Sequence, residues 1–262
     1  RFIQEAEKNT IHKPLLHFHT TITGNFETIT AIDFSQSYDS FYTLSKDRKM
    51  VQWELPSLYE KRSLSISGSP TTFRTNNEIH VSAVSTDKFI ELLDLTTGRN
   101  IGKLTGHTDL CTDSFWISKN QLISSSKDRT VKIFDINRKQ SVATISAASA
   151  TFTISPTMNP VVFAVGGVDG RIRLIDLRQH SVAKVINNIH NRQITCLLPS
   201  SSRQSLYSLS LDNTLNEVSV EAEKIIKKLA KPSPNDKSEL APENSGDIPT
   251  IRITNQFTKM SI

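Results

Sequence analysis

Short segments in which apolar and polar residues alternate recur along this chain. Residues 130–136 read TVKIFDI and residues 171–177 read RIRLIDL. A period of two is typical of a β-strand with one buried face. A polar turn that contains an aspartate precedes each segment, so the pattern predicts hairpins of two strands.

The turn aspartates recur at nearly constant spacing. They are Asp47, Asp87, Asp128, Asp169 and Asp212, at intervals of 40, 41, 41 and 43 residues. Six residues after each aspartate stands a bulky apolar residue, in order Trp53, Leu93, Phe134, Ile175 and Val218. Such self-similarity indicates one supersecondary unit copied along the chain. Because aspartate can accept hydrogen bonds from nearby backbone N–H groups, we expect it to hold each hairpin.

Each repeat has room for four strands. In the third repeat the pattern predicts strands at 110–116, 121–126, 130–136 and 141–145, and the other repeats follow the same plan. At 221–229 we predict the closing strand of the fifth repeat, with a helix as the alternative. The predicted organisation is repeats over 1–229, a linker or disordered loop over 230–247, and a strand over 248–262 that returns to the sheets.

The third repeat carries residues that point to a known family. Gly106-His107, Ser126, Asp128, Phe134 and Asp135 together resemble a WD repeat with phenylalanine at the usual tryptophan position. The resemblance implies an all-β, WD40-type β-propeller of four-stranded antiparallel blades, with five recognisable repeats and six or seven blades in the complete domain. In that family a histidine, a serine or threonine, the turn aspartate and the tryptophan form a hydrogen-bonded tetrad.

The tetrad is unevenly kept. Gly24-Asn25 occupies the histidine position of the first repeat, and Val218-Ser219 ends the last. No repeat has all four residues, so we expect apolar packing between blades to carry most of the fold. The structural residues that the resemblance implies are Ser45, Asp47, Trp53, Asp87, Asp94, His107, Ser126, Asp128, Phe134, Asp135, Asp169, Asp176, His190, Ser210 and Asp212.

The start of the chain is predicted to lie within a blade. Residues 2–6 resemble an inner strand and residues 14–21 an outer strand of a preceding blade, and residue 1 is arginine. These observations suggest a piece of a longer chain, or a ring closed by pairing of the terminal strands.

Length and cysteine content limit the class of protein. A chain of 262 residues is long enough for one large propeller domain. Cys111 and Cys196 fall in equivalent first strands of different repeats, so we expect free thiols and an intracellular location, nuclear or cytoplasmic. No apolar run approaches the ~20 residues of a membrane span.

The chain is basic, with a net charge of +5 and a pI of about 9.2. Basic residues cluster beside the turn aspartates, at Lys46, Arg48, Lys49, Lys88, Lys127, Arg129 and Arg171. In WD repeats these turns line one rim, and a basic rim would attract phosphates or an acidic protein. The alternative is that the charges solvate tight hairpins. No aromatic residues for base stacking are interleaved with them, so nucleic acid is not the favoured partner.

Candidate catalytic and metal-binding groups are accounted for by the repeat. The segment HFH at 17–19 places two imidazoles on one face of a strand without a third ligand nearby. The segment GGVDG at 166–170 lacks the lysine and hydroxyl residue of a phosphate-binding loop. His107, Ser126 and Asp128 have the composition of a catalytic triad, but in the family such groups hold the blade. We therefore expect no enzyme activity, cofactor, metal or small-molecule substrate.

The resemblance implies a protein-interaction scaffold within a multiprotein complex. One alternative is a substrate receptor of a cullin-4 ubiquitin ligase, because residues 163–178 resemble the adaptor-docking motif of such receptors. Asp169, Asp176 and Arg178 stand at its marked positions, and Ala164 and Ile175 depart from it. Another alternative is RNA processing or ribosome assembly through the basic rim. Residues proposed to contact partners are Glu27, Lys46, Arg48, Lys88, Asp109, Lys127, Arg129, Arg171, Arg178 and Arg192.

Overall fold

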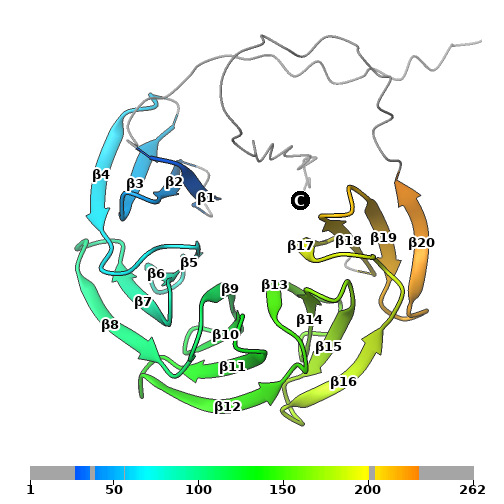
Figure 1. The fold of residues 1–262 in the computed structure, drawn as a ribbon. Coiled ribbons are helices and arrows are strands. Elements are labelled where there is room, and N and C mark those ends of the chain that lie inside the picture. Colours follow the sequence, from blue (N-terminus) through cyan, green and yellow to red (C-terminus); the bar gives the residue numbers. More distant parts are fainter. Residues whose placement is uncertain (1–26, 36–38, 56, 201–203, 230–262) are drawn as a thin grey trace, which may run out of the picture. The chain divides into compact units, whose positions relative to one another are not determined.

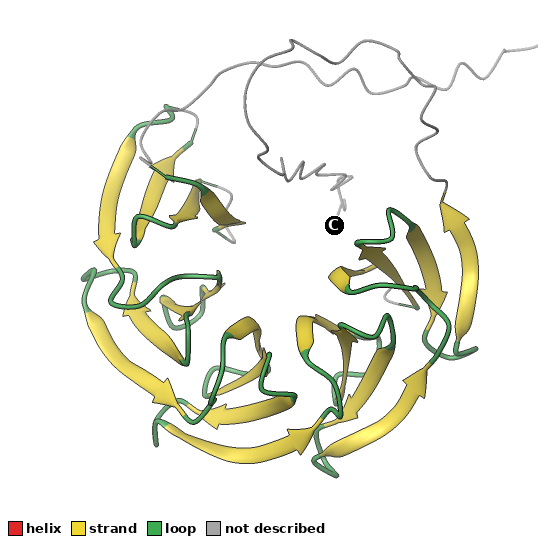
Figure 2. Cartoon of the chain, in the orientation of Figure 1, coloured by secondary structure: helices red, strands yellow, loops and turns green. Residues whose placement is uncertain are grey.

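The computed structural model describes residues 27–35, 39–55, 57–200 and 204–229. These residues form strands and loops and contain no helix (Figure 2). All of them belong to the first of two units into which the chain divides, residues 1–229. The strands predicted at 2–6 and 14–21, Gly24-Asn25, the HFH segment, the linker at 230–247 and the strand at 248–262 lie outside the described residues.

The described residues form five four-stranded antiparallel sheets, and chain order is also sheet order (Figure 1). The first two sheets contain β1 (Ile29–Phe34), β2 (Ser40–Ser45), β3 (Lys49–Glu54), β4 (Glu60–Ser65), β5 (Thr72–Asn76), β6 (Val81–Ser85), β7 (Phe89–Asp94) and β8 (Asn100–Thr105). The third contains β9 (Cys111–Trp116), β10 (Gln121–Ser126), β11 (Thr130–Asp135) and β12 (Gln140–Ser146). The last two contain β13 (Thr151–Pro156), β14 (Val162–Gly167), β15 (Ile172–Asp176), β16 (Ser181–Ile186), β17 (Ile194–Pro199), β18 (Ser205–Ser210), β19 (Leu215–Ser219) and β20 (Lys224–Leu229).

The sheets confirm the predicted all-β architecture of four-stranded antiparallel propeller blades. In the third blade the predicted strands agree with β9 to β12 to within one residue at each end. Residues 221–229 contain β20, which pairs antiparallel with β19 and places Val218 opposite Ile225. The closing strand is therefore confirmed, and the helical alternative is wrong.

The core lies between successive sheets. Side chains of the first two sheets meet in a cluster that includes Leu44, Met50, Phe73 and Leu93. Equivalent clusters join the second sheet to the third, the third to the fourth and the fourth to the fifth. Full burial of one Leu, Ile or Phe side chain contributes roughly 1.5–3 kcal/mol. Each interface between blades is therefore an apolar core with a large share of the stabilisation.

The first strands of neighbouring blades lie side by side (Figure 1). Asp33 accepts hydrogen bonds from the backbone N–H and the hydroxyl of Thr75, at 3.3 and 3.0 Å. Thr112 Oγ1 donates to the carbonyl of Thr151 at 2.8 Å. These bonds fix the first blade against the second and the third against the fourth.

Cys111 in β9 and Cys196 in β17 are free thiols. Burial raises the pKa of Cys111 to about 12 and also raises the pKa of Cys196. Since the thiolate is the reactive form, burial disfavours the reactive form of both side chains at neutral pH.

Gly170 lies in the turn between β14 and β15, where the entry loop of the fifth blade passes close to it. Its φ is +72°, in the left-handed region. A Cβ atom at this position would lie 2.2 Å from the carbonyl oxygen of His190. Conformation and close approach therefore both require glycine.

Gly170→Ala is expected to lower the free energy of unfolding by about 2–5 kcal/mol, since left-handed alanine costs about 1–2 kcal/mol and overpacking about 1–3 kcal/mol. Gly106→Ala is the matched control. Its φ is +139°, and its Cβ would meet the Lys132 side chain at 3.9 Å, so we expect backbone strain of about 1–3 kcal/mol without overpacking. Urea unfolding measures both variants. Equal losses would show that the approach to His190 contributes nothing.

Candidate functional site

Tight turns join the second and third strands of each blade. In four of them the aspartate accepts a hydrogen bond from the N–H two residues later, and the residue between has a positive φ. The acceptor and donor pairs are Asp47 with Lys49 (3.1 Å), Asp128 with Thr130 (2.9 Å), Asp169 with Arg171 (3.4 Å) and Asp212 with Thr214 (3.0 Å). The residues with positive φ are Arg48 (63°), Arg129 (66°), Gly170 (72°) and Asn213 (60°). In these blades the aspartate holds the hairpin.

The second blade departs from the predicted role of Asp87. Thr86 closes this turn, because its backbone N–H and its hydroxyl both donate to the carbonyl of Phe89, at 3.0 and 2.7 Å. The hairpin of β6 and β7 is one residue shorter than the hairpin of β10 and β11, so it has no place for the same turn. The Asp87 side chain is exposed and makes no hydrogen bond within the described part of the chain.

Two buried histidines are held in matching networks. Nδ1 of His107 lies 2.7 Å from the Asp128 carboxylate, and its Nε2 lies 2.7 Å from the hydroxyl of Ser124. His190 of the fifth blade has the same arrangement with its turn aspartate (3.2 Å) and with Ser208 (2.9 Å). Each network lies within one blade and joins the entry loop, the second strand and the turn.

Burial and hydrogen bonding shift the pKa values of these groups. Burial lowers the pKa of His107, and the nearby Asp128 carboxylate only partly offsets this effect. Burial raises the pKa of Asp128, but hydrogen bonds from Thr130, His107 and Thr108 outweigh it, so the pKa lies below its usual value. For Asp212 the corresponding hydrogen bonds outweigh burial and lower the pKa to about 2. The folded networks therefore favour neutral His107 beside ionised carboxylates.

The serine that ends the second strand has a different partner from the one that the resemblance implies. Its hydroxyl donates to a carbonyl in the entry loop of its own blade. The pairs are Ser45 with Glu27 (3.0 Å), Ser126 with Asp109 (3.1 Å) and Ser210 with Arg192 (3.1 Å). Placing Ser45, Ser126 and Ser210 in the tetrad is therefore wrong. Residues two apart share one face of a strand, so the sequence alone does not show which of them reaches the histidine.

The hydroxyl of the tetrad lies two residues earlier, at Thr43, Ser124 and Ser208. In the first blade Thr43 accepts a hydrogen bond from the indole Nε1 of Trp53 at 2.9 Å. In the third blade Phe134 stands at the tryptophan position, and its ring meets that of His107 edge-on with centroids 6.1 Å apart. An apolar contact thus replaces the indole hydrogen bond.

The turns and the entry loops lie together at one end of the blades, called here the turn end. The backbone N–H groups of Lys46 and Lys127 donate to Thr28 and Leu110 in the entry loops, each at 3.0 Å. Exposed residues at the turn end are Glu27, Lys46, Arg48, Lys88, Asp109, Lys127, Arg129, Arg171 and Arg192. The structure therefore brings together all the proposed contact residues except Arg178, which lies beyond the other end of β15.

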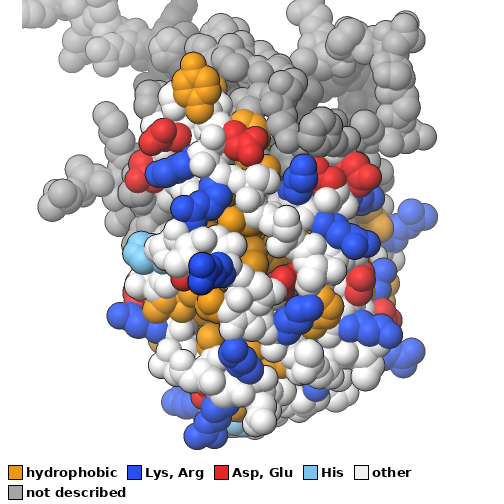
Figure 3. Space-filling model, turned by 90° about the vertical axis from the view of Figure 1, so that its left-hand side faces the viewer, with side chains coloured by type: hydrophobic (Ala, Val, Ile, Leu, Met, Phe, Trp, Pro, Cys, Tyr) orange, Lys and Arg blue, Asp and Glu red, His pale blue; other side chains and the backbone are white. Residues whose placement is uncertain are grey.

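Basic side chains are not confined to the turn end. Figure 3 views the side that carries β4 and β8, and Lys and Arg side chains are spread over it among uncharged ones. Lys61, Arg99 and Lys103 are exposed on these strands and the adjoining loop. Positive charge alone does not distinguish the turn end.

An aromatic residue also lies at the turn end. Phe152 in β13 is half-buried, and the Nζ atom of Lys127 lies 5.8 Å from the centre of its ring. This single contact brings one aromatic residue to a turn charge, although no aromatic residues are interleaved with the turn charges in the sequence. Phe152 is part of a strand with an apolar pattern, so its sequence context did not separate it from core residues.

A family model described as "WD domain, G-beta repeat" matches residues 98–135. This segment contains the buried network of His107, Ser124 and Asp128, and Phe134 at the tryptophan position. The match identifies this segment as a WD repeat. Its four-stranded unit recurs in all five sheets.

Several curated proteins are similar to this WD repeat chain. Protein tipD of Dictyostelium discoideum is 26% identical over 204 residues, which cover 76% of this chain and 33% of that protein. Autophagy-related protein 16 of Arabidopsis thaliana is 24% identical over 192 residues, which cover 71% of this chain and 37% of that protein. U3 small nucleolar RNA-associated protein 15 homolog of Xenopus laevis is 27% identical over 161 residues, which cover 58% of this chain and 30% of that protein. The chain thus spans about a third of the length of these relatives.

The fourth WD repeat has an ion pair where the third and fifth have a histidine. Arg173 is 4% exposed and donates to both carboxylate oxygens of Asp169, at 3.0 and 2.6 Å. Gly167 leaves room for this pair, because a Cβ there would lie 2.7 Å from the guanidinium. Burial raises the pKa of Asp169, but the hydrogen bonds and charge of Arg173 outweigh it and lower the pKa.

A second set of WD repeat aspartates caps the loops between the third and fourth strands. The bonds run from the N–H of Thr96 to Asp94 (2.7 Å), of Arg138 to Asp135 (3.0 Å) and of Arg178 to Asp176 (2.7 Å). The Arg178 side chain is 71% exposed, and its Nε lies 4.0 Å from Asp176. Arg178 is therefore accessible to a partner, whereas Ile175 is buried in the core.

The described residues contain no group of three or more His, Cys, Asp or Glu side chains placed for a metal ion. In the same part of the chain no helix is long and apolar enough to cross a membrane. His107 and Asp128 are in contact, but Ser126 bonds to Asp109 and not to the histidine. The three residues with triad composition are therefore not assembled as a triad.

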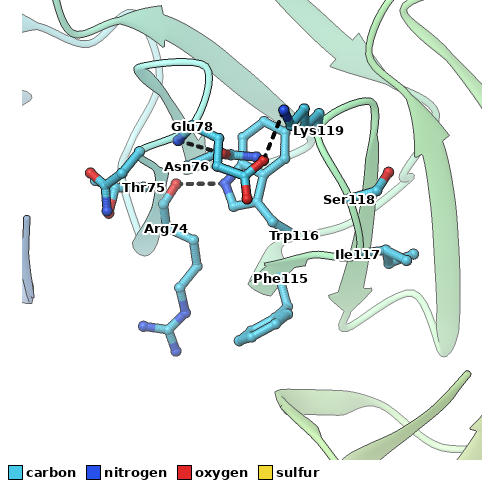
Figure 4. A pocket seen from close by; sticks show the side chains of 10 residues that line it. Arg74, Thr75, Asn76, Glu78, Phe115, Trp116, Ile117, Ser118 and Lys119 are labelled. Atoms are coloured by element: carbon cyan, nitrogen blue, oxygen red, sulfur yellow. Dashed lines mark hydrogen bonds and ion pairs between the residues drawn. The ribbon is translucent and has the colours of Figure 1, made fainter. Parts of the chain in front are cut away.

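A cleft of about 330 Å³ between the second and third blades contains a residue that the WD repeat does not explain (Figure 4). Its walls include Arg74 and Asn76 from β5, and Phe115 and Trp116 from β9. Trp116 is partly exposed, and it stands outside the tryptophan position of the repeat. Sequence reasoning missed this site, although a second tryptophan off the repeat position was a signal for it.

Asp128→Ala is expected to lower the free energy of unfolding by about 1–3 kcal/mol, because it leaves buried partners without their acceptor. Asp87→Ala is the control at the equivalent position of the second blade, and we expect a change within about 0.5 kcal/mol. Denaturant unfolding at pH 7 measures both. Similar losses would contradict the assignment of Thr86 as the residue that closes the second turn.

The unfolding free energy should fall as the pH drops from 7 to 5. Because folding lowers the pKa of His107, its contribution is complete above the unfolded value of about 6.5 and is lost as the pH falls below it. His107→Gln should flatten this slope, and the exposed His180→Gln should leave it unchanged. If the unfolding free energy of His107→Gln still falls as steeply between pH 7 and 5, another titrating group causes the pH dependence. Protonation of the turn aspartates lowers the unfolding free energy only below about pH 4.

Proposed function

We propose that this WD repeat chain is a non-catalytic scaffold that docks protein partners within a multiprotein complex. The division of its polar residues carries the proposal. Histidine, serine and aspartate side chains of the repeat bond one another inside the blades, whereas the proposed contact residues of the loops are exposed. Exposed loops held by a rigid framework are the usual place for partner recognition.

The names of the relatives support a role that depends on the partner. One relative is named as autophagy-related and another as associated with U3 small nucleolar RNA. Shared sequence among proteins with such different names fits a scaffold, since fold does not determine function. We propose an intracellular location, nuclear or cytoplasmic, in keeping with the two free thiols.

A specific observation favours each of two further candidates. The exposed Arg178 beside Asp176 favours a substrate receptor of a cullin-4 ubiquitin ligase. Lys127 over the ring of Phe152 combines charge with an aromatic face and favours RNA binding at the turn end, in RNA processing or ribosome assembly. The scaffold proposal needs neither feature and ranks above both.

Affinity purification of the full chain with mass spectrometry is expected to recover partner proteins. The triple variant Arg48→Glu, Arg129→Glu and Arg171→Glu should lose partners that bind the turn end. The triple variant Lys61→Glu, Arg99→Glu and Lys227→Glu makes the same charge change elsewhere and should keep them. Recovery of no partner by the unmodified chain would contradict the scaffold function.

The same purification separates the other candidates. A ligase receptor requires the cullin adaptor among the partners and its loss in Arg178→Ala. RNA binding through three phosphate contacts at the turn end should weaken roughly 40-fold between 50 and 200 mM salt. An adaptor that is absent, or unaffected by Arg178→Ala, excludes the first, and salt-independent binding excludes the second.

A further inference from the structure

We propose that the cleft between the second and third blades binds an extended acidic segment of a partner protein. A carboxylate of this segment would contact Arg74, and an apolar side chain would pack on Trp116. The inference rests on the proposed scaffold function and gives the chemistry of one docking site.

One wall of the cleft is apolar. Phe115 and Trp116 end β9, Ile117 follows them, and all three are partly exposed. The indole Nε1 of Trp116 donates to the carbonyl of Arg74 across the blade boundary, at 3.0 Å (Figure 4). The ring is therefore already held in place, so a ligand that packs on it need not order it.

The repeat itself does not require tryptophan at this position. The last residue of the first strand is Asn76 in the second blade, Pro156 in the fourth and Pro199 in the fifth. These residues pair with the start of the second strand as Trp116 does. In the first blade the equivalent residue is Phe34, which is also partly exposed, so among the described blades only the tryptophan is specific to the third. Partly exposed aromatic residues are common anchors in protein interfaces.

Arg74 gives the cleft a cation whose hydrogen bonds are incomplete. Its side chain is 35% exposed, and a terminal nitrogen lies 3.7 Å from Asp113. Its Nε is buried and has no hydrogen-bond partner among the described residues. A guanidinium presents its N–H groups as a fork that matches a carboxylate, so an acidic ligand can bind the exposed part of the Arg74 side chain.

Arg74 and Lys119 are each paired with a carboxylate, and part of each side chain stays exposed. Asp113 is buried and accepts the N–H groups of Ser114 and Ile154, each at 2.9 Å, so its carboxylate is already engaged. Lys119 at the rim is 64% exposed and lies 3.3 Å from Glu78. The two cations and two carboxylates balance locally, so the preference for an acidic segment rests on the exposed parts of Arg74 and Lys119 and on the net charge of +5.

The size of the cleft fits part of an extended segment. A volume of about 330 Å³ lies at the lower end of the range of ligand pockets. It accommodates a few side chains of a peptide and is too small for a folded domain.

Tryptophan fluorescence of the full chain tests the proposal with a nine-residue synthetic peptide that has a central leucine flanked by glutamates. Binding should change the emission of the partly exposed Trp116. By calorimetry, Arg74→Gln should weaken binding about tenfold and Lys119→Glu several-fold. Arg99→Gln, an exposed arginine outside the cleft, should leave it unchanged. Trp116→Phe should abolish the change in emission.

Each other outcome overturns a defined part of the proposal. Equal binding of a peptide with lysines in place of the glutamates would exclude recognition of acid. An emission change that persists in Trp116→Phe would place the peptide elsewhere. A single-stranded oligonucleotide that displaces the peptide at equal affinity would indicate a nucleic-acid site. Because Lys119 is on the surface, its variant tests the cleft even if Arg74→Gln fails to fold.

Failure of this inference and failure of the scaffold function are distinguishable. If affinity purification recovers partners and no peptide binds the cleft, the acidic docking site is wrong and the scaffold function stands. If neither the unmodified chain nor any variant recovers a protein, the scaffold function is wrong whatever the peptide does.

Discussion

Each of the five described blades carries apolar side chains on both faces of its sheet, so a blade buries its surface only against neighbours. The four clusters between successive described sheets meet this requirement. Leu93, Ile175 and Val218 differ from tryptophan in shape and lack its N–H donor, yet all three are buried. Apolar character at this position, more than residue identity, is therefore the constraint that the fold imposes.

Different hydrogen bonds close the hairpin between the second and third strands in different blades. The third and fifth blades use a histidine network, the fourth uses the pair of Arg173 and Asp169, and the second closes its turn through Thr86. A buried polar group without a partner costs about 1–3 kcal/mol, so each solution has to supply a complete set of partners. Closure of the hairpin is the common requirement, and the histidine is one means of meeting it.

This division of roles bears on function. Because the repeat residues are engaged within the blades, loops and strand ends can vary without loss of the fold. The two ends of the blades have different chemistry. The turn end carries the basic turns and the contact of Lys127 with Phe152, whereas the opposite end carries the exposed Arg178. In the cleft, Arg74 and Trp116 come from different blades, so a ligand held by both would also stabilise the interface between those blades.

The sequence by itself determined the five repeats, the strands of the third blade to within a residue, and most turn aspartates, because these features depend on local period and spacing. It did not decide between Ser124 and Ser126 as the partner of His107, since both share one face of a strand. It did not show that a shorter hairpin replaces Asp87 by Thr86. The tertiary structure alone placed Lys127 over Phe152 and Trp116 against Arg74, because residues far apart in the chain meet only when blades pack together.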